Sequence, residues 1–273
     1  MPESSRAASR SRASRTPRRA SRIKGALVGI GALLLLSILA FAVYASTPFL
    51  PEEAPLDRVR ADDSLLVTET ADAVILAPRD GATGEGLVFL AGARVSPAAY
   101  AEKLSGLAEA GLTVVIARPI LGFAILEWRP FTTFSDLAPG VDRWLVGGHS
   151  LGGVRACQYV ADQADDADLD APGSSTAPIV GLVFFGSYCA ADISDSPVAV
   201  LSIAGENDGL STSDKIEGAS DLLPASTEFV EIAGANHASF GDYGVQPGDG
   251  TATADDADVR DAITAAVLDA ALD

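Results

Sequence analysis

Residues 147–153 read Gly-Gly-His-Ser-Leu-Gly-Gly, and this stretch decides the fold. It follows the apolar, strand-like segment 144–146 and precedes a segment of helical character. Glycines two residues to either side of Ser150 leave room for a sharp, strained turn that raises its hydroxyl above the sheet edge. Such a turn presents Ser150 as a nucleophile and leaves the backbone N–H of Leu151 free to bind a developing oxyanion. The alternative is an ordinary glycine-rich corner in which the serine has no chemical role.

The chain has only two histidines, so the choice of a base for Ser150 is narrow. His149 lies inside the turn, and we expect its side chain to point away from the site. His237 follows the strand-like segment 228–232, and a loop at the carboxyl end of a late strand suits a catalytic base. Serine is a weak nucleophile without such a base. We therefore predict that His237 takes the serine proton; the alternative is a surface-loop histidine without a catalytic role.

An acid that orients the base is expected between the nucleophile and the base along the chain. The apolar segment 198–204 predicts a buried parallel strand, and the loop after its end contains Asp208. We assign Asp208 to fix the tautomer of His237 and to stabilise the imidazolium. Glu206 and Asp214 are lesser candidates, because the chain has 37 Asp and Glu residues and most such groups are simply solvated.

A second oxyanion donor is expected in the loop after an earlier strand. The strand-like segment 87–90 is followed by Ala-Gly-Ala-Arg-Val at 91–95. We choose the backbone N–H of Ala93 as the donor, with that of Arg94 as the alternative. Ser96 is predicted to cap the helix that follows this loop.

Strand-like and helix-like segments alternate along the rest of the chain. The strand-like segments 64–70 and 73–77 could form an opening hairpin-like pair. Six further strand-like segments follow, at 87–90, 113–117, 144–146, 179–185, 198–204 and 229–232. This alternation predicts an α/β fold with a mostly parallel, doubly wound sheet flanked by helices. A final helix is predicted from one apolar face formed by Val259, Ile263 and Val267.

Two connecting segments leave alternatives open. Residues 119–134 are unusually apolar for a loop after a strand, and they either form a wall of the substrate pocket or pack in the core. Residues 161–177 are rich in aspartate, and we expect a solvated loop there, with a lid over the site as the alternative.

Charge divides the chain in two. Residues 1–24 hold eight basic residues and one acid, a net +7, so the overall charge of −18 leaves −25 for the remainder. The remainder is far too acidic to bind nucleic acid through phosphate contacts. We predict that residues 1–24 form a basic, disordered cytoplasmic tail.

An uncharged segment follows the basic tail. Residues 25–44 are apolar and long enough to span about 30 Å of hydrocarbon. We predict a single-pass transmembrane signal-anchor helix at 25–45, a linker at 46–56 and a hydrolase domain at 57–273, with the N-terminus in the cytoplasm and the domain outside the membrane. The alternative is a signal peptide cleaved near Ala40-Phe41-Ala42, which would release a secreted domain.

The two cysteines, Cys157 and Cys189, are compatible with export from the cytoplasm. A disulfide and two buried thiols both agree with the sequence. The scarcity of histidine argues against a zinc site, and the sequence contains no phosphate-binding glycine loop. We therefore expect neither a metal nor an organic cofactor.

The chain resembles the α/β-hydrolases, and among them small bacterial enzymes similar to dienelactone hydrolase that often carry an N-terminal membrane segment. The resemblance covers residues 57–273, and it rests on the segments 91–100, 144–153, 186–188, 207–209 and 236–244, the last continuing to Gly250. It implies a Ser-Asp-His triad that maps onto Ser150, Asp208 and His237, in the chain order of this family. It indicates a kind of chemistry and names no natural substrate.

These observations together predict a membrane-anchored, extracytoplasmic serine hydrolase. We expect it to cleave small or extended carboxylic esters through an acyl-enzyme intermediate. Two alternatives stay open: a catalytically silent module of the same fold displayed for binding, and an acyltransferase or peptidase that uses the same triad. The sequence gives no indication of the oligomeric state.

Overall fold

The computed structural model describes residues 17–164 and 177–272 of the chain, which divides into the units Met1–Ser46 and Thr47–Asp273. In the first unit, helix α1 runs from Pro17 to Ala45. Its part Lys24–Ala45 is long and apolar enough to cross a membrane, a property that a signal sequence shares. Because α1 begins at Pro17, the end of the predicted disordered tail is helical, and the rest of that prediction lies outside the described residues.

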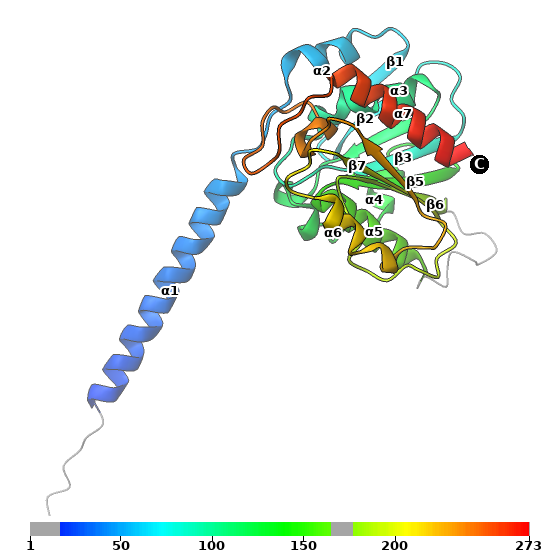
Figure 1. Ribbon diagram of the computed structural model, residues 1–273. Helices are drawn as coiled ribbons and strands as arrows, with labels where there is room; N and C mark the ends of the chain where they lie inside the picture. The colour runs from blue at the N-terminus through cyan, green and yellow to red at the C-terminus, as the bar shows by residue number, and fades with distance from the viewer. Residues whose placement is uncertain (1–16, 165–176, 273) are drawn as a thin grey trace, which may run out of the picture. The chain divides into compact units, whose positions relative to one another are not determined.

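The second unit is built on an eight-stranded sheet in the order β1-β2-β4-β3-β5-β6-β7-β8 (Figure 1). Strands β1 (Leu65–Glu69) and β2 (Ala73–Pro78) form an antiparallel pair, and β2 is antiparallel to β4 (Thr113–Ala117). The remaining strands run parallel to β4: β3 (Glu85–Leu90), β5 (Arg143–His149), β6 (Ile179–Phe185), β7 (Ala199–Gly205) and β8 (Glu228–Ile232). The predicted parallel sheet and its opening strand pair are confirmed.

Helices cover both faces of this sheet (Figure 1). One face carries α2 (Glu53–Arg60), α3 (Ala101–Glu109) and α7 (Asp256–Leu272). The other carries α4 (Thr132–Ser135), α5 (Leu151–Ala164) and α6 (Ser213–Glu217), which is followed by the 3-10 turn η4 (Ser220–Leu222). The central strands β3 to β7 are apolar on both faces because each face is covered, as is typical of parallel sheets, whereas the edge strands β1 and β8 are mostly exposed.

The predicted final helix is α7, and its apolar face packs on α3 and the sheet. Val259, Ile263 and Val267 are fully buried in the same core cluster as Leu104 and Leu107 of α3. Burying one aliphatic side chain of this size contributes about 1.5–3 kcal/mol to stability, so these three side chains hold α7 against this side of the sheet.

The chain after β3 departs from the expected single helix. It begins with the 3-10 turn η1 (Pro97–Tyr100), and α3 continues from Ala101. Ser96 occupies the N-cap position, but its hydroxyl makes no cap hydrogen bond. The carbonyl of Ser96 instead accepts the N–H of Ala99 at 2.9 Å, because a 3-10 turn closes one residue earlier than an α-helix.

The apolar segment after β4 divides between core and surface. It contains the 3-10 turns η2 (Ile120–Gly122) and η3 (Ala124–Leu126). Ala124 and Phe134 are buried in the core. Four large apolar side chains of the same segment are exposed: Leu121, Ile125, Leu126 and Trp128. In the acidic segment that follows α5, residues 165–176 lie outside the described residues, so the choice between a solvated loop and a lid stays a prediction.

Residues 47–56, part of the segment expected as a linker at 46–56, pack on the second unit. The N–H of Phe49 donates to the carbonyl of Arg94 at 2.7 Å, and the N–H of Ser96 donates back to the carbonyl of Phe49 at 2.9 Å. Phe49 thereby pairs in parallel with Val95. The compact unit begins at Thr47 for this reason, upstream of the boundary expected at residue 57.

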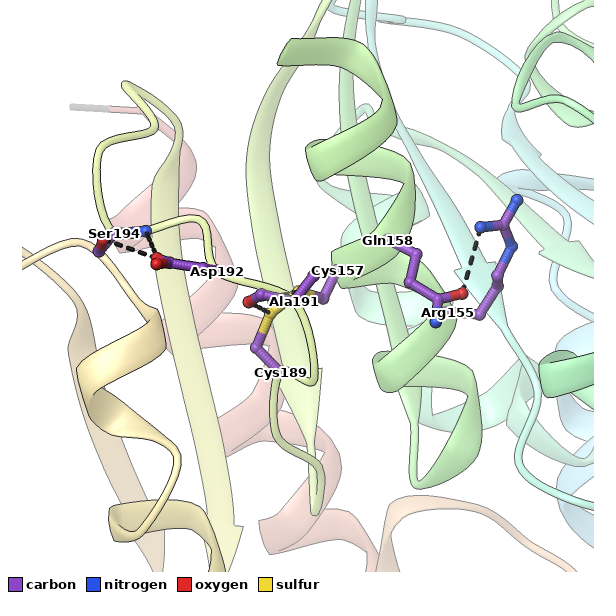
Figure 2. The surroundings of a disulfide bond; sticks show 7 residues. All are labelled: Arg155, Cys157, Gln158, Cys189, Ala191, Asp192 and Ser194. Carbon is purple, nitrogen blue, oxygen red and sulfur yellow. Dashed lines mark hydrogen bonds between the residues drawn. A yellow bond between two sulfur atoms is a disulfide. The ribbon is translucent and has the colours of Figure 1, made fainter. Parts of the chain in front are cut away.

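The two cysteines are joined. Cys157 of α5 forms a disulfide with Cys189, which follows β6, and their Cα atoms lie 5.6 Å apart (Figure 2). The bond links the helix that follows Ser150 to the loop that contains Ser187. Of the two alternatives left open by the sequence, the structure has the disulfide.

Candidate functional site

Ser150 occupies a strained turn between β5 and α5. Its φ is 54°, in the left-handed region that residues other than glycine seldom adopt. Gly148 permits this turn, because a Cβ atom there would lie 2.6 Å from the carbonyl oxygen of Gly152. The carbonyl of Ser150 accepts the Ser187 hydroxyl at 2.7 Å, and its N–H donates to the carbonyl of Phe185 at 3.1 Å. The backbone of the turn is thus fixed by β6 and by the loop that follows β6.

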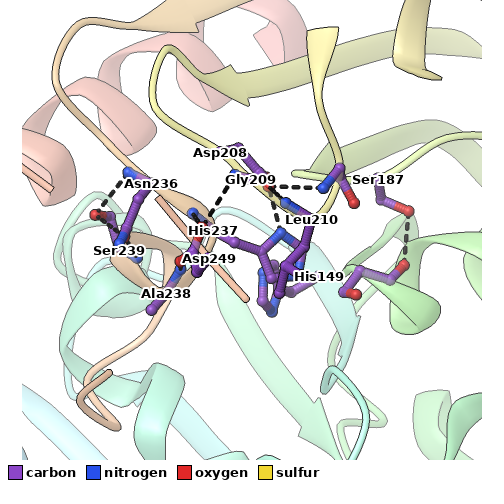
Figure 3. A network of polar contacts seen from close by, with 12 residues as sticks. His149, Ser187, Asp208, Gly209, Leu210, Asn236, His237, Ala238, Ser239 and Asp249 are labelled. Carbon is purple, nitrogen blue, oxygen red and sulfur yellow. Dashed lines mark hydrogen bonds and ion pairs between the residues drawn. The ribbon is translucent and has the colours of Figure 1, made fainter. Parts of the chain in front are cut away.

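His237 and Asp208 meet at the same edge of the sheet. Since β3 to β8 all run parallel, the loops after β5, β7 and β8 gather at one set of carboxyl ends. His237 begins the 3-10 turn η5 (His237–Phe240), and its Nδ1 lies 2.8 Å from Oδ2 of Asp208 (Figure 3). Both side chains are fully buried, at 1% and 0% exposure.

The surroundings of Asp208 set the tautomer of His237. Oδ1 of Asp208 accepts the backbone N–H groups of Leu210 at 2.8 Å and Ser211 at 2.6 Å. Oδ2 is therefore left to accept the Nδ1–H of His237, which places the lone pair of the imidazole on Nε2. Nε2 is buried and has no hydrogen-bond partner among the described residues. This unpaired acceptor is what a general base requires.

The hydrogen bond between Ser150 Oγ and Nε2 of His237 is not formed in the described part of the chain. Nucleophile–base contacts are often long before a substrate binds, and they tighten in the bound complex. The structure therefore brings Asp208 and His237 into direct contact and places Ser150 at the same sheet edge. The catalytic roles of all three stay predictions.

The two lesser acid candidates lie elsewhere. Oε2 of Glu206 accepts the N–H of Gly234 at 2.7 Å, so this carboxylate ties the loop after β7 to the loop after β8. Asp214 lies in the first turn of α6. Asp208 is thus the candidate acid whose carboxylate contacts His237.

Asp249 is a residue that sequence reasoning did not single out. Its Oδ1 accepts the N–H groups of Gly209 and His237, both at 3.1 Å, and its Oδ2 accepts that of Ala238 at 2.8 Å (Figure 3). One carboxylate therefore joins the loop of Asp208 to the turn of His237. The signal was present in the sequence, because Asp249 lies within the segment continued to Gly250 that supports the family resemblance.

His149 does not point away from the site, and that expectation was wrong. Its ring centroid lies 4.3 Å from that of His237, beneath the turn (Figure 3). The hydroxyl of Tyr100 accepts the N–H of Gly92 at 3.0 Å and lies 2.9 Å from Nδ1 of His149. We assign the Tyr100 proton to the bond with Nδ1, because this direction leaves the hydroxyl proton paired, and Nδ1 is then an acceptor. Burial lowers the pKa of His149 well below its usual range, and neighbouring His237 lowers it further, so His149 is neutral.

Two backbone N–H groups in the loops that carry the predicted donors are available to bind an oxyanion. Among the described residues, the N–H groups of Ala93 and Leu151 have no backbone carbonyl as acceptor. The N–H of Arg94, the alternative donor, is already bound to the carbonyl of Gly122 at 2.6 Å. This contact favours Ala93 over Arg94, and both donor assignments stay predictions.

No cluster of three His, Cys, Asp or Glu side chains suited to a metal ion occurs within residues 17–164 and 177–272.

Comparisons with known proteins agree with this architecture. Residues 86–261 match the model of the alpha/beta hydrolase family. No curated protein matches the chain. Among solved structures, a CIB-like hydrolase from Thermoplasma acidophilum has 10% identity and a TM-score of 0.49, over 65% of this chain and 92% of that one. The esterase Est2 from the planctomycete Thermogutta terrifontis has 15% identity and a TM-score of 0.47, over 77% of this chain and 92% of that one.

The similarities to solved structures are too low to carry an argument about function. The family match stands apart from them, because it covers more than half of the chain and includes the turn of Ser150 together with the loops of Asp208 and His237. The chain belongs to the alpha/beta hydrolase family.

Proposed function

We propose that the protein is a serine hydrolase that cleaves carboxylic esters, anchored by α1 in a membrane with its catalytic unit on the extracytoplasmic side. The observation that carries the proposal is the 2.8 Å contact between Asp208 and His237, with the free Nε2 of His237 buried at the sheet edge where Ser150 is held in a strained turn. A buried acid–imidazole pair beside a strained serine is costly to fold and has an evident chemical use.

The chemistry follows from these positions. Ser150 Oγ attacks the ester carbonyl while its proton passes to Nε2 of His237, and the N–H groups of Leu151 and Ala93 bind the oxyanion. Asp208 stabilises the resulting imidazolium without taking its proton. The imidazolium then protonates the departing alcohol, which leaves an acyl group on Ser150. Water, activated by His237, releases the acid and restores the serine. The proposal requires no cofactor.

The disulfide supports the extracytoplasmic location. Disulfides persist in oxidising compartments and are rare in the cytosol, and Cys157–Cys189 joins two described elements of the fold. Basic residues before the apolar segment 25–44 and acidic residues after it favour an N-terminus in the cytoplasm. The alternative, a secreted domain after signal cleavage, predicts a mature chain that lacks α1, and the mass of the natural protein distinguishes the two.

A fluorophosphonate probe tests the central claim, since it labels only an activated serine. We expect stoichiometric labelling of the wild type and none of Ser150→Ala, with His237→Ala labelled more slowly by several orders of magnitude. Near wild-type ester hydrolysis by Ser150→Ala would refute the assignment. A folded wild type that is never labelled would favour the silent binding module instead. Product analysis with added alcohols or amines separates hydrolysis from acyl transfer.

A further inference from the structure

Exposed apolar side chains gather around the turn of Ser150. Among the described residues of the Thr47–Asp273 unit, seven of the nine exposed large apolar side chains lie in segments that follow the carboxyl end of a strand or pair with such a segment. One of the seven, Trp128, lines a pocket with Arg155 and Tyr159 and is left out. We call the other six the apolar edge: Leu50, Leu121, Ile125, Leu126, Tyr188 and Val245, which are between 36% and 89% exposed. A gathering of this kind on a soluble surface marks an interaction site.

Backbone hydrogen bonds and a ring contact hold several of these segments together. The carbonyl of Gly122 accepts the N–H of Arg94, which places the turn of Leu121 beside the loop of the candidate oxyanion donor Ala93. Phe49 pairs with Val95 in the same loop, and its ring lies 5.6 Å from that of Tyr243. The segments of Leu50, Leu121 and Val245 are therefore neighbours of one another and of the candidate site.

Leu121 is held outward by its backbone. Its φ is 53°, in the left-handed region, and its side chain is 61% exposed. A leucine in this conformation is uncommon, and the backbone strain lowers the free energy of unfolding. Because the side chain is exposed, no packing contact within the unit compensates for that loss. Both features are expected when an exposed leucine contacts an apolar partner.

Charge is missing from the apolar edge although the unit is strongly acidic. The four segments that supply it, 47–51, 119–126, 186–190 and 243–248, contain no charged residue. The part of the chain after residue 24 has a net charge of −25. An acid-free, apolar surface fits a lipid interface, because a carboxylate placed there would lose hydration and be repelled by anionic lipids.

The position at which the chain enters this unit indicates which lipid surface the apolar edge contacts. The Arg94 guanidinium donates to the carbonyl and, at 2.7 Å, to the hydroxyl of Thr47, so the chain is fixed at the apolar edge from its first residue in this unit. Helix α1 ends at Ala45, and only Ser46 lies between. Covalent geometry alone keeps Ala45 within about 7 Å of Thr47. The chain therefore passes from α1 to this edge over a single intervening residue, which limits how far the edge can lie from a bilayer that holds α1.

We propose that the apolar edge lies on the surface of the bilayer that holds α1, and that the substrates are esters of membrane-embedded amphiphiles. This inference rests on the proposed ester hydrolysis and names its substrate class. The ester bond is cleaved by water at the interface. The acid and the alcohol then each stay in the bilayer or dissolve according to their own solubility. The ester need not be extracted into water first.

The test uses the full chain in phosphatidylcholine vesicles and two fluorogenic esters. 4-Methylumbelliferyl butyrate reports hydrolysis of a dissolved ester, and 4-methylumbelliferyl oleate reports hydrolysis of one embedded in the bilayer. The variant is Leu121→Asn with Val245→Gln, since asparagine tolerates the left-handed backbone at position 121. The matched control is Leu66→Gln with Phe229→Gln, which removes two exposed apolar side chains from β1 and β8, outside the apolar edge.

Rates are divided by the number of serines labelled by fluorophosphonate. We expect the edge variant to lose about tenfold or more on the embedded ester, because two side chains no longer enter the lipid. The rate on the dissolved ester stays within about twofold. The control pair leaves both rates near wild type.

Three results overturn the inference. They are an unchanged rate of the edge variant on the embedded ester, an equal loss on both esters, and a wild type that cleaves only the dissolved ester. A wild type that is neither labelled nor active on the dissolved ester overturns the proposed function itself, and the substrate claim with it.

Discussion

Replacing Gly186 by alanine tests whether the contact between Asp208 and His237 orients the base. Gly186 follows β6 with a φ of 48°, and a Cβ atom there would lie 2.8 Å from Oδ2 of Asp208 and 3.2 Å from Nδ1 of His237. A carbon–oxygen contact is comfortable at about 3.3 Å or more, so the carboxylate must retreat by about half an ångström. The new methyl group therefore acts on the Asp208–His237 bond itself.

The size of the effect follows from that displacement. The Nδ1–Oδ2 separation of 2.8 Å would lengthen beyond the usual range of a charge-assisted hydrogen bond. Misplacement by 1 Å costs about a hundredfold in rate, and loss of the correct tautomer costs about 10⁴-fold. We expect Gly186→Ala to lower the rate of fluorophosphonate labelling about 10- to 100-fold. The left-handed backbone adds a loss of about 1–2 kcal/mol in the free energy of unfolding.

Gly81→Ala is the matched control, because it carries the backbone penalty without the collision. Gly81 has a φ of 76° and nothing within 4 Å of an added Cβ atom. Both variants should lose stability in urea unfolding, Gly186→Ala by more because of the buried collision, and only Gly186→Ala should label slowly. A Gly186→Ala variant that labels at the wild-type rate, or a Gly81→Ala variant that slows as much, would show that this contact does not control the serine.

Two further predictions concern stability. Burial raises the pKa of Asp242 to about 6 despite the attraction of Lys103, 3.0 Å away, so the folded chain holds a proton that the unfolded chain releases from about pH 3.8. Stability from this group is complete below pH 3.8 and falls by about 3 kcal/mol as the pH rises through 6. In urea unfolding, the stability of Asp242→Asn relative to wild type should therefore rise by about 3 kcal/mol between pH 4 and pH 8. A difference independent of pH would contradict this. The Cys157–Cys189 bond closes a separation of 32 residues, so Cys157→Ser with Cys189→Ser should lose about 4 kcal/mol. Reductant should lower the melting temperature of the wild type and leave that of the double variant unchanged.

The sequence was informative where the signal is local. The strained turn of Ser150 is encoded by flanking glycines within five residues, and the parallel strands are encoded by short apolar runs. The loop of Asp208 follows from the strand before it. These features depend on neighbours along the chain, so the fold and the candidate nucleophile could be placed without a structure.

The features that sequence reasoning missed depend on contacts between distant residues. Asp249 accepts the N–H of Gly209, which lies 40 residues away in the sequence, and the residues around Asp249 do not indicate that partner. The buried pair of Lys103 and Asp242 likewise looks like two surface charges in the sequence, although Lys103 is completely buried. The partners of the Tyr100 hydroxyl are likewise not evident from the sequence, because the packing of the segments after β3 and at the end of β5 brings them together.

His149, whose direction was predicted wrongly, shows why such contacts matter for the proposed chemistry. Two charged imidazoles with centroids 4.3 Å apart would repel by about 4 kcal/mol at an effective dielectric constant of 20. That repulsion would oppose the imidazolium that His237 forms when it takes the serine proton. The Tyr100 hydroxyl donates to Nδ1 of His149, and burial disfavours its charged form, so His149 stays neutral. A second histidine can therefore pack against the base without opposing proton transfer, provided that Tyr100 and Gly92 hold it in this state.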